Sequence, residues 1–360
     1  MKKITFLLLL VAGLFPFIGA AQKRAPSTKV KKIEGGPYRF TSETTGFPSC
    51  NTSAWELQFE DEFNGSQLNT KYWKVPYQGL VQGYNLEQHG HKQWYANSGS
   101  TPALPISNNI VLEDGILKLL VKKETTPIHG SYVTDWSTNP PTKDSNDFEF
   151  SAAWLESVEL YGYGFYEARC KLPKGKGMWP AFWLFKGENG LNFEIDIFEF
   201  WNENSCFGMY DESKLSKNPH FNIHSNQLLY PHDLTSPSDL YRPCQKWPET
   251  GFDDDFHVFG LLWDAYKIEW YIDGEKVRTA YRYRDKKGNP INCQSNPKKQ
   301  DEWLEASYWP NTTSMDVRFN IAVQYGKNNE PLSEDVFPKS FEIDYFRFYK
   351  QKSTSPIQSK

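Results

Sequence analysis

The sequence predicts an all-β fold, a single sandwich of two antiparallel sheets. Short runs of β-branched and aromatic residues follow one another over residues 55–350, most with the two-residue alternation of half-buried strands. Helical spacing is nearly absent, and no internal repeat indicates a propeller or a solenoid. The chain contains 13 Trp, 20 Tyr and 25 Phe, enough large apolar rings to offset the entropy of ordering the backbone. A disordered chain is therefore excluded.

The two ends of the chain differ from its middle. Lys2 and Lys3 precede an apolar run that is followed by small residues up to Ala21, the layout of a secretory signal peptide. The run is shorter than the roughly 20 residues of a membrane-spanning helix, so we expect a secreted protein, extracellular or periplasmic, with no membrane anchor. The expected division of the chain is a signal peptide at 1–21, a flexible leader at 22–50, a folded domain at 51–350 and a tail at 351–360.

Charge and cysteine content exclude further classes of protein. The chain has 40 basic and 44 acidic residues and a formal net charge of -4, so it lacks the positive field that would hold nucleic acid. Its five cysteines show no CxxC spacing and hence no zinc signal. Export permits disulfides, and an odd number leaves at least one thiol unpaired. Cys170, at an alternating position of a strand-like run, is expected to be a small buried apolar residue.

The strand-like runs are separated by turns and by long polar segments. Asp114-Gly115 and Asp273-Gly274 each lie between two runs, which predicts tight hairpins. Long insertions on a rigid sheet are where binding is usually built. The segments with the strand pattern are 109–123, 164–173, 181–185, 193–201, 220–225, 256–264, 267–278, 318–325 and 341–350. The expected polar insertions are at about 76–107, 125–150, 201–219, 230–252 and 284–312.

The sharpest feature is the segment FEIDIFEF at 193–200. In a strand, residues two apart share a face, so Glu194 and Asp196 point together while Ile195 points the other way. Glu199 is out of phase by one residue. A one-residue bulge between Asp196 and Glu199 would bring all three acids onto one face, and bulges are common beside active sites.

Three aligned carboxylates favour acid–base chemistry, because they repel one another and raise at least one pKa. Glycoside hydrolysis needs such a set: one carboxylate attacks the anomeric carbon while a second, protonated one donates to the leaving oxygen. Two other readings stay open. One is an exposed acidic edge strand. The other is a metal site, limited to oxygen-only calcium binding because the segment has no histidine.

The motif EIDIFE at 194–199 resembles the ExDxxE signature of glycoside hydrolase family 16 in its bulged form. The resemblance covers most of the chain in family order, and it implies a β-jelly-roll sandwich with a long cleft across its concave sheet. The other segments that carry it are FEDEFNGSQLNTKYW at 59–73, GYGFYEARCKLPKGKGMWPAFWLF at 162–185, DFHVFGLLWDAYKIEWYIDGEKV at 255–277 and IDYFRFYK at 343–350.

Residue roles follow from the resemblance by position. It implies a retaining mechanism in which Glu194 is the nucleophile, Asp196 its assistant and Glu199 the general acid/base. It also implies a set of residues that line the cleft and contact the substrate, in which indole rings would stack on the C–H faces of sugars. These residues are Trp179, Trp183, His224, Trp94 and Gln93.

The resemblance implies an endo-acting β-glycanase that cuts internal β-1,3 or β-1,4 bonds of a polysaccharide. Phe193 stands where laminarin-cleaving members commonly carry a glycine, so a laminarin- or lichenan-type β-glucan and a marine galactan (agar, porphyran or carrageenan) both stay open. The alternatives from other classes are a catalytically inactive, lectin-like carbohydrate-binding protein on the same fold and an extracellular interaction protein. We expect no required cofactor, a monomer, and room for the structural calcium that is frequent in the family.

Overall fold

The computed structural model describes the larger part of the predicted domain. The predicted signal peptide and leader lie outside the described residues, as do all of the tail after Gln351 and most of the insertions predicted at 76–107, 201–219 and 230–252. The described residues are 55–75, 93–95, 109–135, 138, 140, 142–175, 177–188, 191–200, 223–225, 252–306, 309–323 and 336–351.

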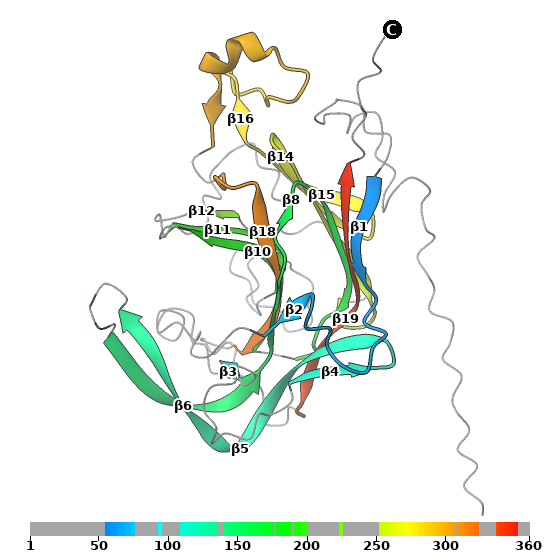
Figure 1. Ribbon diagram of the computed structural model, residues 1–360, viewed down its shortest axis with the longest axis vertical. Helices are drawn as coiled ribbons and strands as arrows, with labels where there is room; N and C mark the ends of the chain where they lie inside the picture. Colours follow the sequence, from blue (N-terminus) through cyan, green and yellow to red (C-terminus); the bar gives the residue numbers. More distant parts are fainter. Residues whose placement is uncertain are drawn as a thin grey trace, which may run out of the picture.

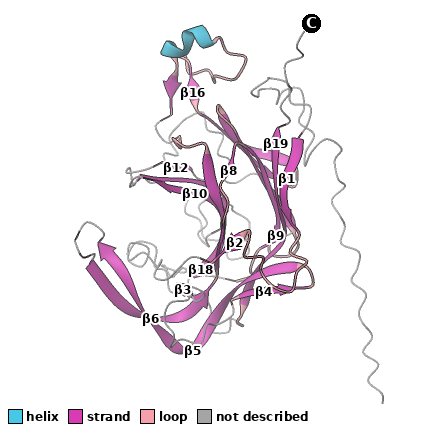
Figure 2. Cartoon of the chain, viewed as in Figure 1, coloured by secondary structure: helices cyan, strands magenta, loops and turns pink. Residues whose placement is uncertain are grey.

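Two large sheets face each other and confirm the predicted all-β sandwich (Figures 1 and 2). Neighbouring strands are antiparallel except for β3 and β6, which run parallel. The ten-stranded sheet has the order β15 (Glu275–Tyr281), β14 (Lys267–Ile272), β13 (His257–Trp263), β9 (Gly164–Lys171), β19 (Lys339–Gln351), β5 (Ile116–Asp135), β6 (Thr142–Ala152) and β3 (Gln93–Tyr95), with β1 (Trp55–Asp61) beside β19 and β4 (Ile110–Glu113) beside β5.

The seven-stranded sheet contains the acidic segment. Strand β11 is next to the end of the sheet, between β10 and the short strand β12. The order of this sheet is β12 (Ile223–Ser225), β11 (Leu191–Glu199), β10 (Met178–Glu188), β18 (Ser314–Val323), β7 (Trp154–Ser157) and β2 (Trp73–Lys74), with β8 (Tyr161–Gly162) beside β18.

An aromatic core fills the space between the two sheets. Phe182 of β10 and Phe319 of β18 stack with ring centroids 4.4 Å apart and planes inclined by 11°. Phe198 of β11 contacts Phe259 of β13 across the sandwich, with centroids 4.4 Å apart. Phe259, Phe319 and Phe346, on three different strands, are all 0 % exposed. Burial of such rings is the main stabilising term of the sandwich.

Both predicted hairpin turns are confirmed. Asp114 and Gly115 connect β4 to β5 with φ angles of 55° and 72°, and Asp273 and Gly274 connect β14 to β15 with φ angles of 49° and 90°. Positive φ at both central residues is the requirement of a type I′ turn, and Asp-Gly meets it at low cost.

The prediction of a polar insertion at 125–150 is wrong. This segment continues β5 and β6 as one long hairpin that pairs as far as Asp135 and Thr142 and extends from the body at the lower left of Figure 1. The side chains of 142–147 are exposed, so the outer half of the hairpin lacks the apolar alternation from which strands are predicted. Main-chain pairing forms these strands, helped by contacts such as that between His129 and Asp147 at 2.9 Å.

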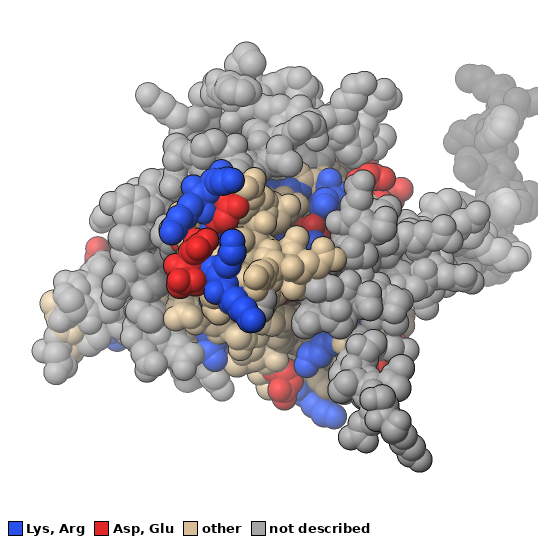
Figure 3. All heavy atoms as spheres, turned by 90° about the horizontal axis from the view of Figure 1, so that it is seen from above, with Lys and Arg blue, Asp and Glu red and all other residues tan. Residues whose placement is uncertain are grey.

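The predicted insertion at 284–312 contains a small substructure of its own. Strands β16 (Tyr283–Arg284) and β17 (Leu304–Glu305) pair, and the 3-10 helix η3 (Pro297–Glu302) lies between them in sequence. Among the residues that the structure describes, no helix is long and apolar enough to cross a lipid bilayer. Viewed from this end of the molecule, Lys and Arg lie next to Asp and Glu (Figure 3), as in the ion pair of Arg282 with Glu305 at 2.7 Å.

The cysteines follow the expectation where they are described. Cys170 is a free thiol with no exposed area in the core, and burial raises the pKa of this thiol well above its usual value. Cys293 is disulfide-bonded. The other three cysteines lie outside the described residues.

Candidate functional site

A bulge in β11 aligns the three acids, as the sequence predicted. Phe182 of β10 is opposite Phe198, whereas the next residue of β10 is opposite Asp196, so Ile197 has no partner. Ile197 and Phe198 are 1 % and 0 % exposed, both within the core. Two consecutive residues on the core side are what a one-residue bulge produces. Glu199 is thereby returned to the face that carries Asp196.

The register across β10 confirms that the acids share the outer face of the seven-stranded sheet. Glu194 is opposite Phe185, Asp196 is opposite Trp183, and Glu199 is opposite Ala181. These three residues of β10 are at alternate positions, so their side chains point the same way. The acids differ in exposure: Asp196 is 1 % exposed, whereas Glu194 and Glu199 are partly exposed.

Trp179 contacts the last of the three acids directly. Its indole Nε1–H donates a hydrogen bond of 3.2 Å to Oε1 of Glu199. Trp179 is 9 % exposed and begins the alternating row of β10 that continues with Ala181 and Trp183. The predicted cleft tryptophan therefore lies beside the predicted acid/base, and its hydrogen bond restricts the orientation of that carboxyl group.

Trp183 is held by a hydrogen-bond chain that sequence reasoning missed. Its Nε1–H donates to Oδ1 of Asn320 on β18 at 2.7 Å, and Nδ2 of Asn320 donates to the hydroxyl of Tyr95 on β3 at 3.3 Å. Burial raises the pKa of Tyr95 far above its usual range, so this hydroxyl stays protonated at neutral pH. The indole plane of Trp183 is thus fixed before any ligand arrives.

Arg318 lies at the centre of a ring of aromatic side chains next to the acids. Its guanidinium carbon is 4.9 Å from the ring centroid of Trp183, 4.1 Å from that of Phe185 and 5.7 Å from that of Trp154. Trp154 also packs against Trp183, with ring centroids 5.6 Å apart. We call Trp154, Trp183, Phe185 and Arg318 the Arg318 cluster. It extends across β10, β18 and β7 from the strand that carries the acids.

The positive charge of the Arg318 cluster is neutralised by carboxylates. Arg318 Nε is 2.5 Å from Asp316 Oδ1, and its Nη2 is 3.3 Å from Glu156 Oε1. Lys74 completes the network at 3.2 Å from Glu156. These two basic and two acidic groups together leave no net charge beside Trp183.

The polar residues of β18 that sequence analysis did not predict share a recognisable pattern of alternation. In β18 the core side chains Met315, Val317 and Phe319 alternate with Asp316, Arg318 and Asn320. Three polar residues at alternate positions of a strand with an apolar opposite face indicate which side chains lie on the outer face of the sheet, where the acids of β11 also lie. The alternation was present in the sequence, but its partner residues on β7 and β10 are fixed only by the register of the sheet.

Two of the predicted substrate contacts are corrected by the structure. Gln93 is 0 % exposed, and its Oε1 accepts a hydrogen bond of 2.8 Å from the main-chain N of Val323. Trp94 belongs to the hydrophobic core and packs against Phe148, with ring centroids 5.3 Å apart. The sequence of so short a segment does not show which of its side chains face the core. Here Gln93 and Trp94 lie beside β6 at the edge of the sheet, and both are buried. They support the sandwich and offer no surface to a sugar.

The structure describes only the backbone of His224, the fifth predicted substrate contact. His224 is opposite Glu194 in the pairing of β12 with β11, and its side chain lies outside the described part of the structure. Among the described residues, no group of three or more His, Cys, Asp or Glu side chains is arranged to hold a metal ion.

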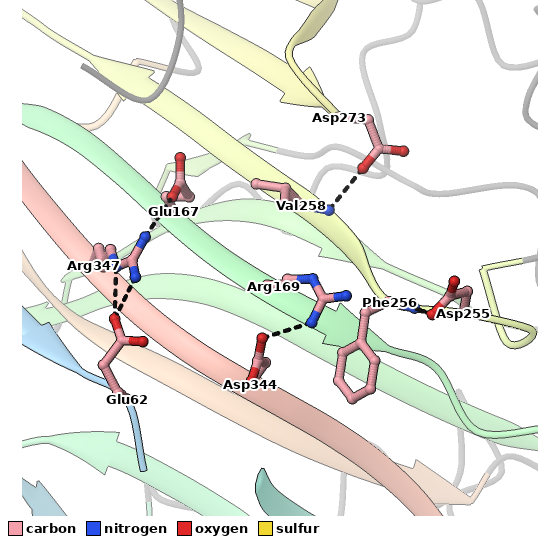
Figure 4. A network of polar contacts seen from close by, with 9 residues as sticks. All are labelled: Glu62, Glu167, Arg169, Asp255, Phe256, Val258, Asp273, Asp344 and Arg347. Atoms are coloured by element: carbon pink, nitrogen blue, oxygen red, sulfur yellow. Dashed lines mark hydrogen bonds and ion pairs between the residues drawn. The ribbon is translucent and has the colours of Figure 1, made fainter. Parts of the chain in front are cut away.

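A second polar network lies on the other sheet, on the face directed away from the core (Figure 4). Arg347 of β19 is 2.5 Å from Glu62 and 3.9 Å from Glu167, and Arg169 of β9 is 2.6 Å from Asp344. Its ion pairs connect β9, β19 and the residue that follows β1. Because these strands belong to the ten-stranded sheet, the network stabilises that sheet and takes no part in the acid site.

Comparison with known proteins agrees with this geometry. Residues 55–351 match the family model described as "Beta-porphyranase A-D, GH16 domain". A curated relative, the endo-1,3-1,4-beta-glycanase ExsH of Rhizobium meliloti (strain 1021), is 24 % identical over 242 residues, which cover 64 % of this chain and 44 % of that protein. The chain spans 44 %, 42 % and 38 % of the length of the first three curated relatives.

Solved structures share the fold. The endo-beta-1,3-glucanase from Pyrococcus furiosus aligns with a TM-score of 0.55 and 25 % identity, over 83 % of this chain and 95 % of that one. Porphyranase B from Zobellia galactanivorans aligns with a TM-score of 0.52 and 16 % identity, over 82 % of this chain and 93 % of that one. These likenesses confirm the predicted jelly-roll sandwich.

Proposed function

Because the chain belongs to glycoside hydrolase family 16, and is therefore a glycoside hydrolase, we propose that it is a secreted, retaining endo-β-glycanase acting on a porphyran- or agar-type galactan. The observation that carries the proposal is the bulge at Ile197, which places Glu194, Asp196 and Glu199 on one face beside Trp179 and Trp183. A purely carbohydrate-binding protein needs the aromatic residues but has no use for three aligned acids.

The proposed reaction is a double displacement. A carboxylate oxygen of Glu194 attacks the anomeric carbon while Glu199 donates its proton to the glycosidic oxygen, so the leaving chain departs and a glycosyl ester forms. Glu199 then takes a proton from water, and the water oxygen displaces Glu194. Two inversions retain the β configuration. Asp196 lies between the two, where its carboxyl group can hydrogen-bond the nucleophile and tune its basicity.

Trp179 and the Arg318 cluster would hold the substrate. The indole of Trp183 is partly exposed and can offer its face to the C–H groups of a sugar ring, and Asn320 fixes its orientation. The family model that matches the chain describes porphyranases, which supports a red-algal galactan. The carboxylates of Asp316 and Glu156 neutralise the charge of Arg318, which supports an uncharged unit of that galactan at this position.

A second candidate substrate is a β-1,3- or β-1,3-1,4-glucan. The curated relatives favour it, since the names of the first of them describe endo-1,3-1,4-beta-glycanases and a glucan endo-1,3-beta-glucosidase. The reaction and the residues would be the same, and only the sugar bound by the cluster would differ.

One experiment tests both the reaction and the substrate. The purified protein is incubated with porphyran, agarose, carrageenan, laminarin and lichenan, and released oligosaccharides are quantified for the wild type, Glu194→Gln and Glu199→Gln. We expect release from porphyran or agarose and a loss of at least about a hundredfold in both variants. Asp301→Asn, an exposed carboxylate of η3, is the control and should match the wild type. Binding of a polysaccharide in a gel-shift assay without release from any substrate would support the lectin-like alternative.

A further inference from the structure

The acidic part of β11 contains the bulge at Ile197. Among the described residues, strand β12 pairs with β11 from Phe193 to Ile195. From Asp196 onward, the pairing among the described residues is with β10 alone, and that pairing is interrupted by the bulge at Ile197. The register between β10 and β11 therefore changes within the segment that carries Asp196 and Glu199.

A tryptophan of the facing sheet provides additional support at this point. The indole Nε1–H of Trp270, on β14, donates a hydrogen bond of 2.7 Å to the main-chain oxygen of Asp196. The bulge directs this carbonyl group to the core, where water could not satisfy it. Trp270 is itself immobilised: it is 0 % exposed, and the guanidinium of Arg278 lies 4.8 Å from its ring centroid.

We propose that Trp270 is a positioning residue that fixes the bulge of β11 and thereby the phase of the acids. The inference rests on the proposed function for its effect on catalysis. Trp270 contacts no substrate and acts through the backbone of Asp196. Without its hydrogen bond, the carbonyl group of Asp196 would turn toward β10 or solvent, and the residue after Ile197 would lose its registration with β10. Glu199 would then be displaced relative to Glu194, although no acid had been changed.

The neighbouring strand supplies a matched comparison. Trp263 of β13 is also buried, at 1 % exposure, in the same core. Its indole N–H has no hydrogen-bond partner among the described residues. Replacing either tryptophan by phenylalanine removes the same volume from the core, but only the change at Trp270 removes a hydrogen bond to the acidic strand.

The test compares Trp270→Phe with Trp263→Phe in the full chain. Two quantities are measured: steady-state kinetics on the polysaccharide that the wild type cleaves, and hydrogen–deuterium exchange of the main-chain amides of 196–200. For Trp270→Phe we expect kcat to fall about 10- to 100-fold with KM nearly unchanged, as for a misplaced catalytic group, and exchange to become faster. Trp263→Phe should keep both near the wild-type values.

A third variant separates the hydrogen bond from packing. Replacing Trp270 by 3-benzothienylalanine, through nonsense suppression, puts sulfur in place of the indole N–H and keeps the shape of the ring. It should fold even if Trp270→Phe does not, and it should show the same fall in kcat and the same faster exchange. The proposal is overturned if this variant keeps wild-type kcat and exchange, or if the effects of Trp270→Phe equal those of Trp263→Phe.

The exchange measurement keeps the inference separate from the proposed function. If the wild type cleaves none of the polysaccharides, the proposed function fails. Faster exchange at 196–200 in the benzothienyl variant would still support the positioning of the bulge by Trp270, and unchanged exchange would contradict it.

Discussion

The indole of Trp179 donates a hydrogen bond of 3.2 Å to the carboxyl group of Glu199 from the adjacent strand. The two residues meet because the bulge at Ile197 returns Glu199 to the face of β10 that carries Trp179. This contact makes Trp179 an orienting partner for the proposed acid/base.

Trp179→Phe should lower kcat by about tenfold, because Glu199 loses the donor that restricts its carboxyl group. The aromatic platform is retained, so KM should change less than kcat. Steady-state kinetics on the preferred polysaccharide measures both values. Trp303→Phe, in the β16–β17 region where Trp303 packs on Tyr283, is the control. Equal kcat for Trp179→Phe and the wild type would show that the hydrogen bond has no role in the reaction.

Arg318→Lys should raise KM with little change in kcat. A lysine can keep the ion pairs with Asp316 and Glu156, but it lacks the planar guanidinium that stacks on Trp183 and Phe185. Loss of about 0.5–2 kcal/mol of stacking energy should leave the ring of Trp183 less firmly oriented. We expect sugar binding to be severalfold weaker as a result. Isothermal titration of oligosaccharide into inactive Glu194→Gln, with and without the change at Arg318, measures the binding step directly.

Arg282→Lys is the matched control for that change. Arg282 also stacks on an aromatic ring, with 4.9 Å between its guanidinium carbon and the Tyr283 centroid, and also pairs with a carboxylate, that of Glu305. It belongs to the β16–β17 region and not to the strands of the acid site. If both variants weakened oligosaccharide binding equally, the Arg318 cluster would not be a sugar site.

Part of the acid site could be predicted because its pattern is local. The two-residue period puts Glu194 and Asp196 together, and the one-residue mismatch of Glu199 predicts a bulge, which the structure has at Ile197. The two Asp-Gly turns and the buried position of Cys170 were predicted for the same reason. Each of these depends on alternation or turn chemistry within a few residues.

The parts that could not be predicted depend on distant segments. Trp270 reaches the carbonyl group of Asp196 from 74 residues away in the sequence. Arg318 meets Trp154 only through the register of β18 with β7. In the outer β5–β6 hairpin, residues 142–147 are polar and exposed on both faces, so they give no periodic signal although their backbone pairs with β5. Gln93 and Trp94 were misplaced because three residues of strand do not indicate which side is buried.

The buried position of Trp94 predicts that Gly130 tolerates no side chain. A Cβ atom at Gly130 would lie 2.2 Å from Cζ3 of Trp94. Gly130→Ala should therefore reduce the free energy of unfolding by about 1–3 kcal/mol through overpacking, with KM unchanged if Trp94 is a core residue. Chemical denaturation and kinetics test the two statements. If the variant kept full stability but had a raised KM, the assignment of Trp94 to the core would be contradicted and Trp94 would be a cleft residue.

Stability should depend on pH through Glu167, in the network of Figure 4. Burial raises the pKa of Glu167 from 4.5 to about 7, against the lowering effects of Tyr345 and Arg347. The folded protein thus binds more protons than the unfolded chain between these two values, so this group makes the protein less stable as pH rises from about 4.5 to about 7. Glu167→Gln should remove a penalty of about 3 kcal/mol at pH 8 and almost none at pH 4.

Thermal unfolding of Glu167→Gln and the wild type at pH 4, 6 and 8 measures this difference. Glu269→Gln is a comparison of opposite sign: burial raises the pKa of Glu269, but Lys267 and Lys276 outweigh it and the pKa is lowered. That variant should lose stability at neutral pH and lose less as pH falls. A constant difference between Glu167→Gln and the wild type at all three pH values would contradict the assignment.

The stereochemistry of the product tests the central claim most directly. If Glu194 is a nucleophile aligned with Glu199 by the bulge, each cleavage involves two inversions, and the new reducing end is released as the β anomer. Proton NMR recorded during the first minutes of hydrolysis, before mutarotation, distinguishes the two anomers. We expect the β signal to appear first and the α signal to grow in later. Initial release of the α anomer would show a single inversion and would contradict the role of Glu194.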